Sequence, residues 1–192
     1  VERSRGLGDV YKRLSEDYDV GADGRSLMIR DVAAKAAGRD SQRAFKFDQV
    51  LPMDITQAQV FERVGKRVVQ NALDGYNSTV FAYGQTGSGK TFTITGGSER
   101  YEDRGIIPRA LSMIFQEFRS RSDCSWSAHI SYMEIYNEEI RDLLSRDPDG
   151  NRSHIKLVNG HNGLTQVLNL EERVVESSEE VNDVVAAGLK RR

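Results

Sequence analysis

Eight consecutive residues near the middle of the chain have the types and the spacing of a phosphate-binding loop. The pattern G-x-x-x-x-G-K-[ST] is matched at every fixed position by Gly84-Gln85-Thr86-Gly87-Ser88-Gly89-Lys90-Thr91. Glycines let a backbone wrap closely around a phosphate and point several N–H groups at its oxygens. Lys90 would add a full positive charge facing the β- and γ-phosphates, and Thr91 would offer a hydroxyl to Mg²⁺. The spacing therefore predicts a nucleotide-phosphate site.

The segments on either side of this loop are those that position such a loop in an α/β protein. A β-prone run, Thr79–Tyr83, leads into the loop, and a helix pattern follows from Lys90. We therefore expect an inner strand over 78–83, a loop over 84–89 and a helix from about Lys90, whose N-terminus would add partial positive charge. The alternative is a glycine-rich turn that contains Lys-Thr by chance, and this context argues against it.

Further helices and strands are expected along the chain from its apolar spacing. Thr56 and Gln59 have capping-box spacing before an amphipathic helix that carries Val60, Val64, Val68 and Ala72 and ends at Gly75. Helices are also expected from Pro108, with Phe115 in its buried stripe, and after Ser177 and Glu180. Strands are expected at 27–29, 45–51, 126–136, 155–158 and 163–170. Strands and crossover helices in this order indicate an α/β sheet.

The composition narrows the classes of protein that fit. Of 192 residues, 38% are hydrophobic and 29% are charged, which is typical of a globular domain. The net charge of −2 lacks the basic excess of a nucleic-acid-binding domain, and no apolar run has the length of a membrane span. We expect neither nucleic acid nor a membrane as partner. Cys124 is the only cysteine and has no partner at metal-ligand spacing, so we interpret it as a structural thiol.

Longer stretches around the loop resemble one family. Gly75–Thr91 resembles the phosphate-loop signature of kinesin motor domains. Three further segments are similar to later kinesin signatures, in kinesin order: Gly105–Arg109, Ser131–Glu138 and Ile140–Leu144. The resemblance covers residues 45–192 as a partial motor domain, whereas residues 1–44 form a poorly determined N-terminal part of it. Phe92–Tyr101 is most similar to kinesin family nine, which is associated with cilia and flagella.

The resemblance implies a three-layer α/β P-loop NTPase fold and an ATPase motor that moves along microtubules, with ATP and Mg²⁺ as cofactors. It places the protein in the cytoplasm on the microtubule cytoskeleton and, through family nine, in the cilium or flagellum axoneme. The ATP-binding residues that it implies are Gly84, Gln85, Thr86, Gly87, Ser88, Gly89, Lys90, Thr91 and Phe92, with Thr91 as the Mg²⁺ ligand. Phe92 falls where kinesins often place a residue beside adenine, and either base stacking or core packing would suit it.

Other kinesin signatures do not occur in this sequence. The two switch patterns, Asn-x-x-Ser-Ser-Arg-Ser-His and Asp-Leu-Ala-Gly-Ser-Glu, are absent, as is the opening strand with Arg-x-Arg-Pro. We therefore expect an incomplete motor fold that contains no catalytic residue. Two alternatives stay open: a shortened chain that binds nucleotide without catalysis, and another P-loop NTPase such as a nucleotide kinase. The kinesin signatures outside the loop argue against the second alternative.

A lobe of short strands over about 154–172 corresponds to a secondary tubulin contact in kinesins. Its basic candidates are Arg152, His154, Lys156 and His161. The alternative is an ordinary solvated set of surface charges, and we favour it because exposed charges are weak signals.

Overall fold

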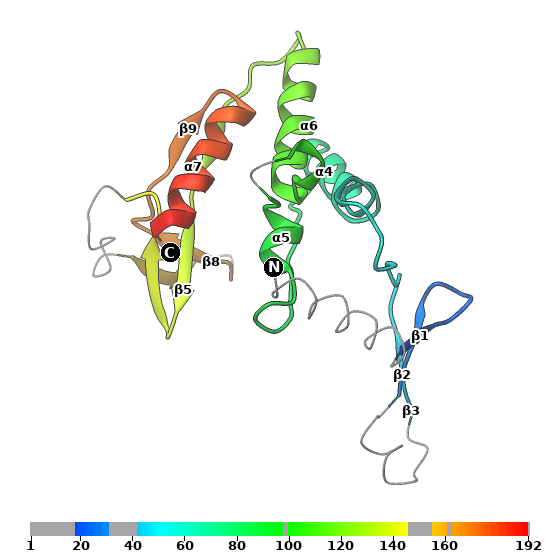
Figure 1. Cartoon of the computed structure of the whole chain (residues 1–192). Coiled ribbons are helices and arrows are strands. Elements are labelled where there is room, and N and C mark those ends of the chain that lie inside the picture. The colour runs from blue at the N-terminus through cyan, green and yellow to red at the C-terminus, as the bar shows by residue number, and fades with distance from the viewer. Residues whose placement is uncertain (1–17, 31–41, 98–99, 146–154, 161–162, 192) are drawn as a thin grey trace, which may run out of the picture. The chain divides into compact units, whose positions relative to one another are not determined.

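The computed structural model describes residues 18–30, 42–97, 100–145, 155–160 and 163–191. It divides the chain into two compact units, residues 1–55 and residues 56–192. Figure 1 shows their helices and strands.

The described part of the first unit is a three-stranded antiparallel sheet. Its strands are β1 (Tyr18–Val20), β2 (Ser26–Arg30) and β3 (Gln42–Lys46), in the order β1-β2-β3. The predicted strand at 27–29 is confirmed within β2, whereas the strand predicted at 45–51 lies earlier, at 42–46. The ladder ends there because β2 begins at Ser26, and the chain beyond β3 bonds to the preceding turn, where the N–H of Val50 donates to the carbonyl of Gly24 at 2.8 Å.

A tight turn joins β1 to β2 through Asp23. One carboxylate oxygen accepts the backbone N–H groups of Arg25 and Ser26, each at 2.9 Å, and the other accepts the Ser26 hydroxyl at 2.7 Å. These bonds, that from the Arg25 N–H foremost, lower the pKa of Asp23 to about 2. The carboxylate of Asp23 therefore holds the turn that precedes β2.

The second unit opens with the predicted capped helix. Helix α3 (Gln57–Val60) continues through a π-helical segment, Phe61–Gly65, into α4 (Lys66–Leu73). Thr56 accepts the N–H of Gln59 at 3.2 Å and donates its own N–H to the Gln59 side chain at 3.0 Å, so the predicted capping box is confirmed. The helix ends before Gly75, which takes the left-handed conformation (φ 95°) that its position predicted.

The buried line of this helix runs one residue later than the predicted Val60–Ala72 stripe. It passes through Phe61, Gly65 and Val69, whereas Val64 is exposed. Gly65 allows the helix to pack closely along this line. A Cβ at that position would meet the Phe61 ring at 2.6 Å and Ile106 at 3.4 Å. A glycine carries no hydrophobic signal, so its role in close helix packing was not visible from the apolar pattern.

The chain from residue 77 to residue 83 enters the glycine-rich loop without forming a strand, so the strand predicted at 78–83 is wrong in the described part of the chain. No described segment pairs with this run, and Phe81 and Tyr83 are 84% and 95% exposed. An extended run becomes a strand only when a second segment completes its hydrogen-bond ladder. The loop itself is non-helical up to Gly89, and helix α5 (Lys90–Ile94) begins at Lys90 as expected.

Helix α6 (Ile106–Ser120) follows a short return segment. A 3₁₀ turn, η2 (Tyr101–Asp103), leads into it, and an isolated bridge joins Gly96 to Arg104. The helix begins two residues before Pro108, which becomes its third residue. Phe115 is buried, as predicted.

The remaining strands form two-stranded antiparallel pairs. Strand β4 (Ala128–Ile130) pairs with β9 (Arg173–Val175), β5 (Met133–Tyr136) with β6 (Glu139–Asp142), and β7 (Lys156–Asn159) with β8 (Thr165–Leu168). The last two match the short strands predicted around 155–170. The single strand predicted at 126–136 is wrong, because its two halves pair with different partners on either side of Ser131 and Tyr132.

Helix α7 (Ser178–Arg191) completes the unit. The N–H of Glu180 donates to the Ser177 hydroxyl at 3.1 Å, which confirms the predicted helix start. Val181 and Val185 of this helix pack with Phe115 of α6 and Val175 of β9 in one hydrophobic cluster. Every strand pairing in the described residues is antiparallel, so they contain no parallel crossover sheet.

Candidate nucleotide site

The glycine-rich loop has a backbone that its glycines make possible. Gly87 and Gly89 have φ angles of 84° and 89°, in the left-handed region that side chains rarely adopt. The N–H of Ser88 donates to the carbonyl of Gln85 at 3.2 Å and closes the turn. A Cβ at Gly84 would lie 2.6 Å from the Ser88 hydroxyl oxygen. The loop therefore needs glycine for its shape at three of its positions.

Lys90 places a positive charge across this loop. It is the first residue of α5, and its side chain folds back so that Nζ donates to the carbonyl of Gln85 at 2.7 Å. The ammonium group is thus held against the loop backbone that the motif assigns to the phosphates. A phosphate oxygen can take the place of a carbonyl oxygen as its acceptor, with a stronger, charge-assisted hydrogen bond.

Thr91 and Phe92 follow Lys90 on the same short helix, and both are exposed. The side chain of Phe92 is 50% exposed and is not part of either buried cluster, so the described structure does not support core packing for it. An exposed aromatic face remains free to stack on a base. The remaining motif residues, Gln85 and Thr86, are also exposed.

The residues present fit a nucleoside triphosphate with Mg²⁺. The loop is bent at glycines with positive φ, one ammonium group already lies on it, and an exposed threonine follows. A hollow of about 300 Å³ adjoins Lys90 and Thr91 and is otherwise mostly apolar, with Val80, Ala82, Ile107 and Leu189 in its lining. Backbone N–H groups, an ammonium and a hydroxyl are the groups that bind phosphate and Mg²⁺ in such loops.

One residue at this site was missed in the sequence. The side-chain amide of Gln57, which is only 8% exposed, donates to the backbone carbonyl of Phe92 at 2.6 Å. The sequence offered one signal, since Gln57 lies inside the recognised Thr56–Gln59 cap. Its partner, however, is 35 residues away along the chain, so no local pattern could assign it.

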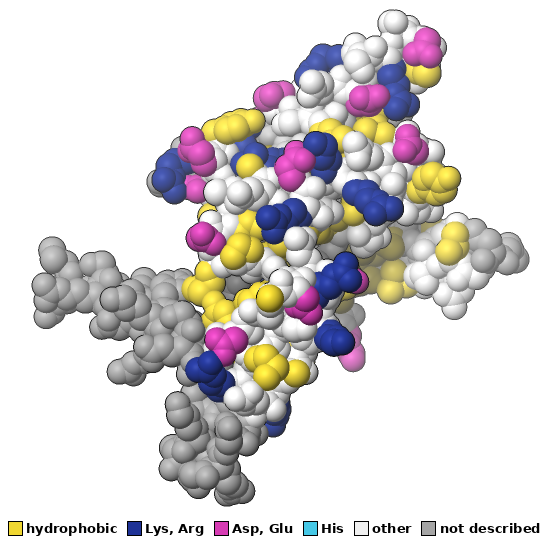
Figure 2. Space-filling model, turned by 90° about the vertical axis from the view of Figure 1, so that its right-hand side faces the viewer, with side chains coloured by type: hydrophobic (Ala, Val, Ile, Leu, Met, Phe, Trp, Pro, Cys, Tyr) yellow, Lys and Arg dark blue, Asp and Glu magenta, His cyan; other side chains and the backbone are white. Residues whose placement is uncertain are grey.

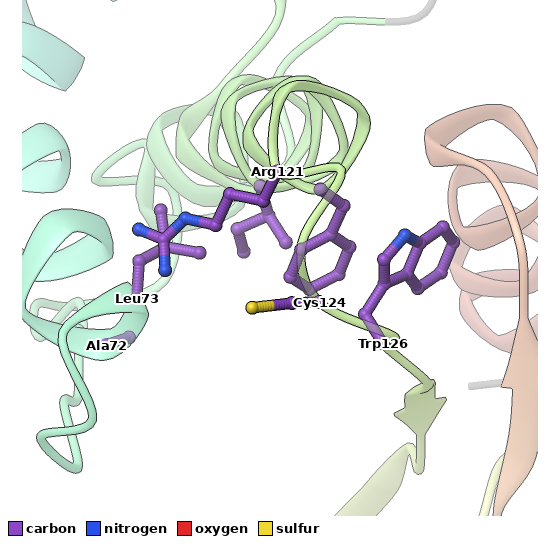
Figure 3. Close-up of a pocket in the computed structure, with 7 residues that line it drawn as sticks. Ala72, Leu73, Arg121, Cys124 and Trp126 are labelled. Atoms are coloured by element: carbon purple, nitrogen blue, oxygen red, sulfur yellow. The ribbon is translucent and has the colours of Figure 1, made fainter.

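A second hollow, of about 330 Å³, lies between α4 and the end of α6 (Figure 3). Cys124 and Arg121 contribute to its lining. Cys124 is a free and exposed thiol, and its interpretation as a structural thiol stays a prediction. Among the described residues, no cluster of His, Cys, Asp or Glu could hold a metal ion. Trp126 stacks on Phe118 with ring centroids 4.7 Å apart.

The predicted tubulin-facing lobe is only partly described. Lys156 is exposed on β7, whereas Arg152, His154 and His161 lie outside the described residues. Lys156 is thus the one basic candidate of the four among the described residues, and a single exposed lysine is ordinary for a solvated surface, so the secondary tubulin contact stays a prediction. On the face that Figure 2 shows, basic and acidic side chains are interspersed.

Comparison with known proteins identifies the family. Residues 12–192 match the kinesin motor domain model. The chain belongs to the kinesin motor domain family. It is 39% identical over 165 residues to kinesin-like protein KLP1 of Chlamydomonas reinhardtii, covering 84% of this chain and 21% of that protein. It is 50% identical over 132 residues to human kinesin-like protein KIF9, covering 67% of this chain and 17% of that protein, which agrees with the resemblance to family nine.

A solved kinesin structure confirms the fold. A fast kinesin, described for its ATPase mechanism and its interactions with microtubules, matches with a TM-score of 0.79 and 33% identity. The match covers 91% of this kinesin chain and 47% of that one. The predicted kinesin motor fold, as a partial domain, is therefore confirmed. The chain spans about a fifth of the length of the curated relatives that it matches. In the described part of this kinesin chain, no helix is long and apolar enough to cross a bilayer.

Proposed function

We propose that this chain is the nucleotide-binding part of an ATP-driven microtubule motor, and that Gly84–Thr91 binds ATP with Mg²⁺. The observation that carries the proposal is the 2.7 Å hydrogen bond from Lys90 Nζ to the Gln85 carbonyl, across a loop bent at Gly87 and Gly89. It places the motif's only full positive charge beside the backbone that would surround the phosphates. Membership of the kinesin family supports ATP as the nucleotide and microtubules as the track.

Each motif residue has one task in this proposal. The backbone N–H groups of the loop bind phosphate oxygens, and Lys90 moves from the Gln85 carbonyl to the β- and γ-phosphates. Thr91 holds Mg²⁺ through its hydroxyl, and the exposed ring of Phe92 lies against the base. Bound ATP with Mg²⁺ supplies the phosphoanhydride bond whose cleavage drives movement. We assign no catalytic residue, because hydrolysis needs a positioned water and a γ-phosphate sensor from other segments.

The cellular place of the motor follows from its family. Kinesin membership supports the microtubule cytoskeleton as its location. The 50% identity to KIF9 and the resemblance of Phe92–Tyr101 to family nine support the axoneme of a cilium or flagellum.

For the polypeptide of residues 1–192 by itself, a second candidate function is nucleotide binding without catalysis. It is favoured by one observation, the absence of both switch patterns from the 192-residue sequence. A nucleotide kinase or other P-loop NTPase is disfavoured, because the family match extends over residues 12–192 and far beyond the loop.

Equilibrium binding of ATP in the presence of Mg²⁺ tests the proposed site. Lys90→Ala should weaken binding about 10- to 100-fold, since a charged group's hydrogen bond to phosphate is lost. Lys66→Ala is the matched control, because Lys66 belongs to α4 and not to α5, and its half-exposed side chain pairs with Glu62 at 2.8 Å. It should bind as the parent does. Equal affinity of Lys90→Ala and the parent would refute the assignment.

A further inference from the structure

The side-chain amide of Gln57 hydrogen-bonds to two backbone segments that follow the phosphate loop along the chain. Its Nε2 donates to the carbonyl of Phe92 at 2.6 Å and, more weakly, to that of Asp103 at 3.4 Å. Phe92 belongs to α5, whereas Asp103 belongs to the segment that returns toward α6. Gln57 itself is buried, with 8% of its surface exposed, so little water reaches these bonds.

The bond to Phe92 lies where α5 stops being a regular helix. In a continuing α-helix the N–H of Gly96 would donate to the Phe92 carbonyl, four residues earlier. Here the N–H of Gly96 donates instead to the carbonyl of Thr91, at 3.3 Å. The Gln57 amide therefore takes the place of the missing helical donor. It fixes the end of a helix whose first two residues are Lys90 and Thr91.

The hydrogen bond to Asp103 connects the segment that returns toward α6 to the same Gln57 amide. The Asp103 carbonyl also accepts the N–H of Gly97 at 2.9 Å, and the N–H of Gly105 donates to the carbonyl of Thr95 at 3.2 Å. A Cβ at Gly96 would lie 2.2 Å from the Asp103 oxygen, so these two backbones are in direct contact. A shift of α5 would therefore have to move the returning segment as well.

Gln57 can act as a fixed point because its own backbone is anchored. It is the first residue of α3, and the helix that follows it is packed against α6. Phe61, on the following turn, packs with Ile106 of α6 in the buried cluster that also contacts Ile94 of α5. The amide thus extends from a helix that packing, and not the exposed cap, holds in place.

We propose that Gln57 is a positioning residue for the phosphate site, whose amide sets the place of α5 and so of Lys90 and Thr91. The inference rests on the proposed function for its consequence, because the position of α5 matters to affinity only if Lys90 and Thr91 bind the nucleotide. A purely structural Gln57 would contribute to folding and leave the affinity of the folded chain unchanged.

Three variants of the full 192-residue chain separate these roles. Gln57→Leu keeps most of the side-chain volume but removes both hydrogen bonds to the carbonyls. Gln57→Glu keeps the shape of the side chain and replaces the donor by a carboxylate. It provides the test if the leucine variant does not fold. Gln59→Ala is the matched control, because Gln59 lies on the same turn, is exposed and contributes only to the cap. For each variant we would measure the dissociation constant for ATP with Mg²⁺, the melting temperature without nucleotide and backbone amide exchange.

Both Gln57 variants should weaken ATP binding roughly tenfold, the effect of losing one or two buried hydrogen bonds. Amide exchange at Thr95 and Gly96 should become faster in the same proteins. Gln59→Ala should lower the melting temperature and leave both the affinity and this exchange as in the parent. Lower melting temperatures for the Gln57 variants with parental affinity would overturn the proposal.

Amide exchange also separates this proposal from the proposed function. If the parent chain binds no ATP, the nucleotide assignment fails, and exchange alone decides the role of Gln57. Faster exchange at Thr95 and Gly96 in the Gln57 variants, but not in Gln59→Ala, would still support the inference that the Gln57 amide fixes the position of α5. Unchanged exchange would remove that support and overturn the inference.

Discussion

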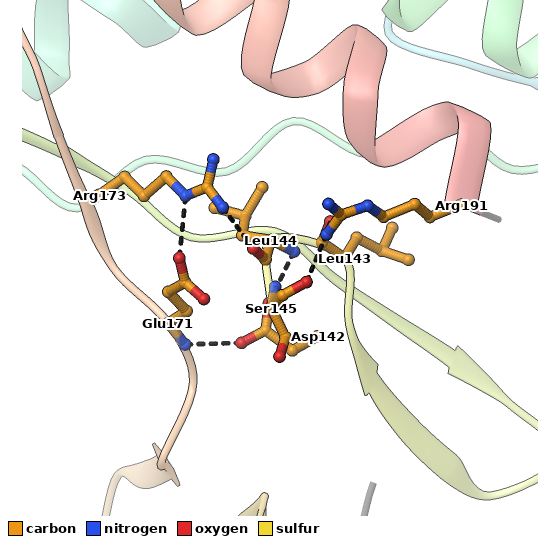
Figure 4. Close-up of polar contacts among 7 residues, drawn as sticks. All are labelled: Asp142, Leu143, Leu144, Ser145, Glu171, Arg173 and Arg191. Atoms are coloured by element: carbon orange, nitrogen blue, oxygen red, sulfur yellow. Dashed lines mark hydrogen bonds and ion pairs between the residues drawn. The ribbon is translucent and has the colours of Figure 1, made fainter. Parts of the chain in front are cut away.

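The carboxylate of Asp142 lies buried at the end of β6 and accepts the backbone N–H of Glu171 at 2.7 Å, which joins segments 29 residues apart (Figure 4). Its other oxygen accepts the N–H groups of Leu144 and Ser145 at 2.8 and 3.2 Å. Arg191, from the last turn of α7, donates to the carbonyl of Ser145. One carboxylate thus organises a turn to which β6, the approach to β9 and the end of α7 are all attached.

Asp142→Ala should destabilise the chain by about 2–3 kcal/mol, because three backbone N–H groups lose their acceptor in a buried place. Urea unfolding followed by circular dichroism measures the change. Glu139→Ala is the control in the same hairpin, since Glu139 is exposed and lies 3.9 Å from its ionic partner Arg141. The control should change stability by less than about 0.5 kcal/mol. A similar small effect of Asp142→Ala would contradict the role given to this carboxylate.

Gly65→Ala should destabilise the chain by about 1–3 kcal/mol, the usual cost of overpacking. Alanine in place of glycine inside a helix is ordinarily favourable by about 0.5–1 kcal/mol, so the expected sign is reversed. The reason is the Cβ position, which is 2.6 Å from the Phe61 ring. Thermal unfolding of the variant decides the sign, and a higher melting temperature would show that Phe61 can move aside.

Phe92→Ala should weaken ATP binding about 5- to 150-fold, because stacking of one base on an aromatic ring contributes about 1–3 kcal/mol. Binding of inorganic tripolyphosphate, which has no base, should stay at the parental level. The melting temperature should change little, since Phe92 is 50% exposed. Equal losses for ATP and tripolyphosphate would show that Phe92 acts on the loop and not on the base.

The polypeptide of residues 1–192 should not show ATPase activity that microtubules stimulate. Catalysis of phosphoryl transfer is positioning and charge stabilisation by several segments, and neither switch pattern occurs in this sequence. Groups that act as a unit are lost together, so the activity should be nearly absent and not merely reduced. Steady-state phosphate release with and without polymerised microtubules measures it. A rate that rises and saturates with microtubule concentration would place the catalytic groups within these residues.

The sequence predicted helix ends well because their signals are local. Thr56 with Gln59, Gly75, and Ser177 with Glu180 each act within a few residues, and the structure confirms all three. Strands depend on partners that a local pattern does not show. The run over 78–83 pairs with no described segment, and the run over 126–136 is divided between two partners.

The same distinction applies to the candidate site. The motif placed the loop and the start of α5, since both depend on glycines and a helix start in one short stretch. It did not reveal Gln57, whose two acceptors are 35 and 46 residues away. A buried side-chain donor that ends another helix is a tertiary feature, and only the folded structure shows it.

The most direct test of the nucleotide site is a map of backbone amide chemical shifts in the isotope-labelled chain during titration with ATP and Mg²⁺. We predict that the largest saturable shifts fall on Gly87, Gly89 and Lys90, because their N–H groups would bind the phosphates, whereas the Ser88 N–H closes the turn to Gln85. The Lys90→Ala variant should need far more nucleotide to reach the same shifts. Saturable ATP binding that leaves these three amides unshifted would contradict the proposed site and place the nucleotide elsewhere.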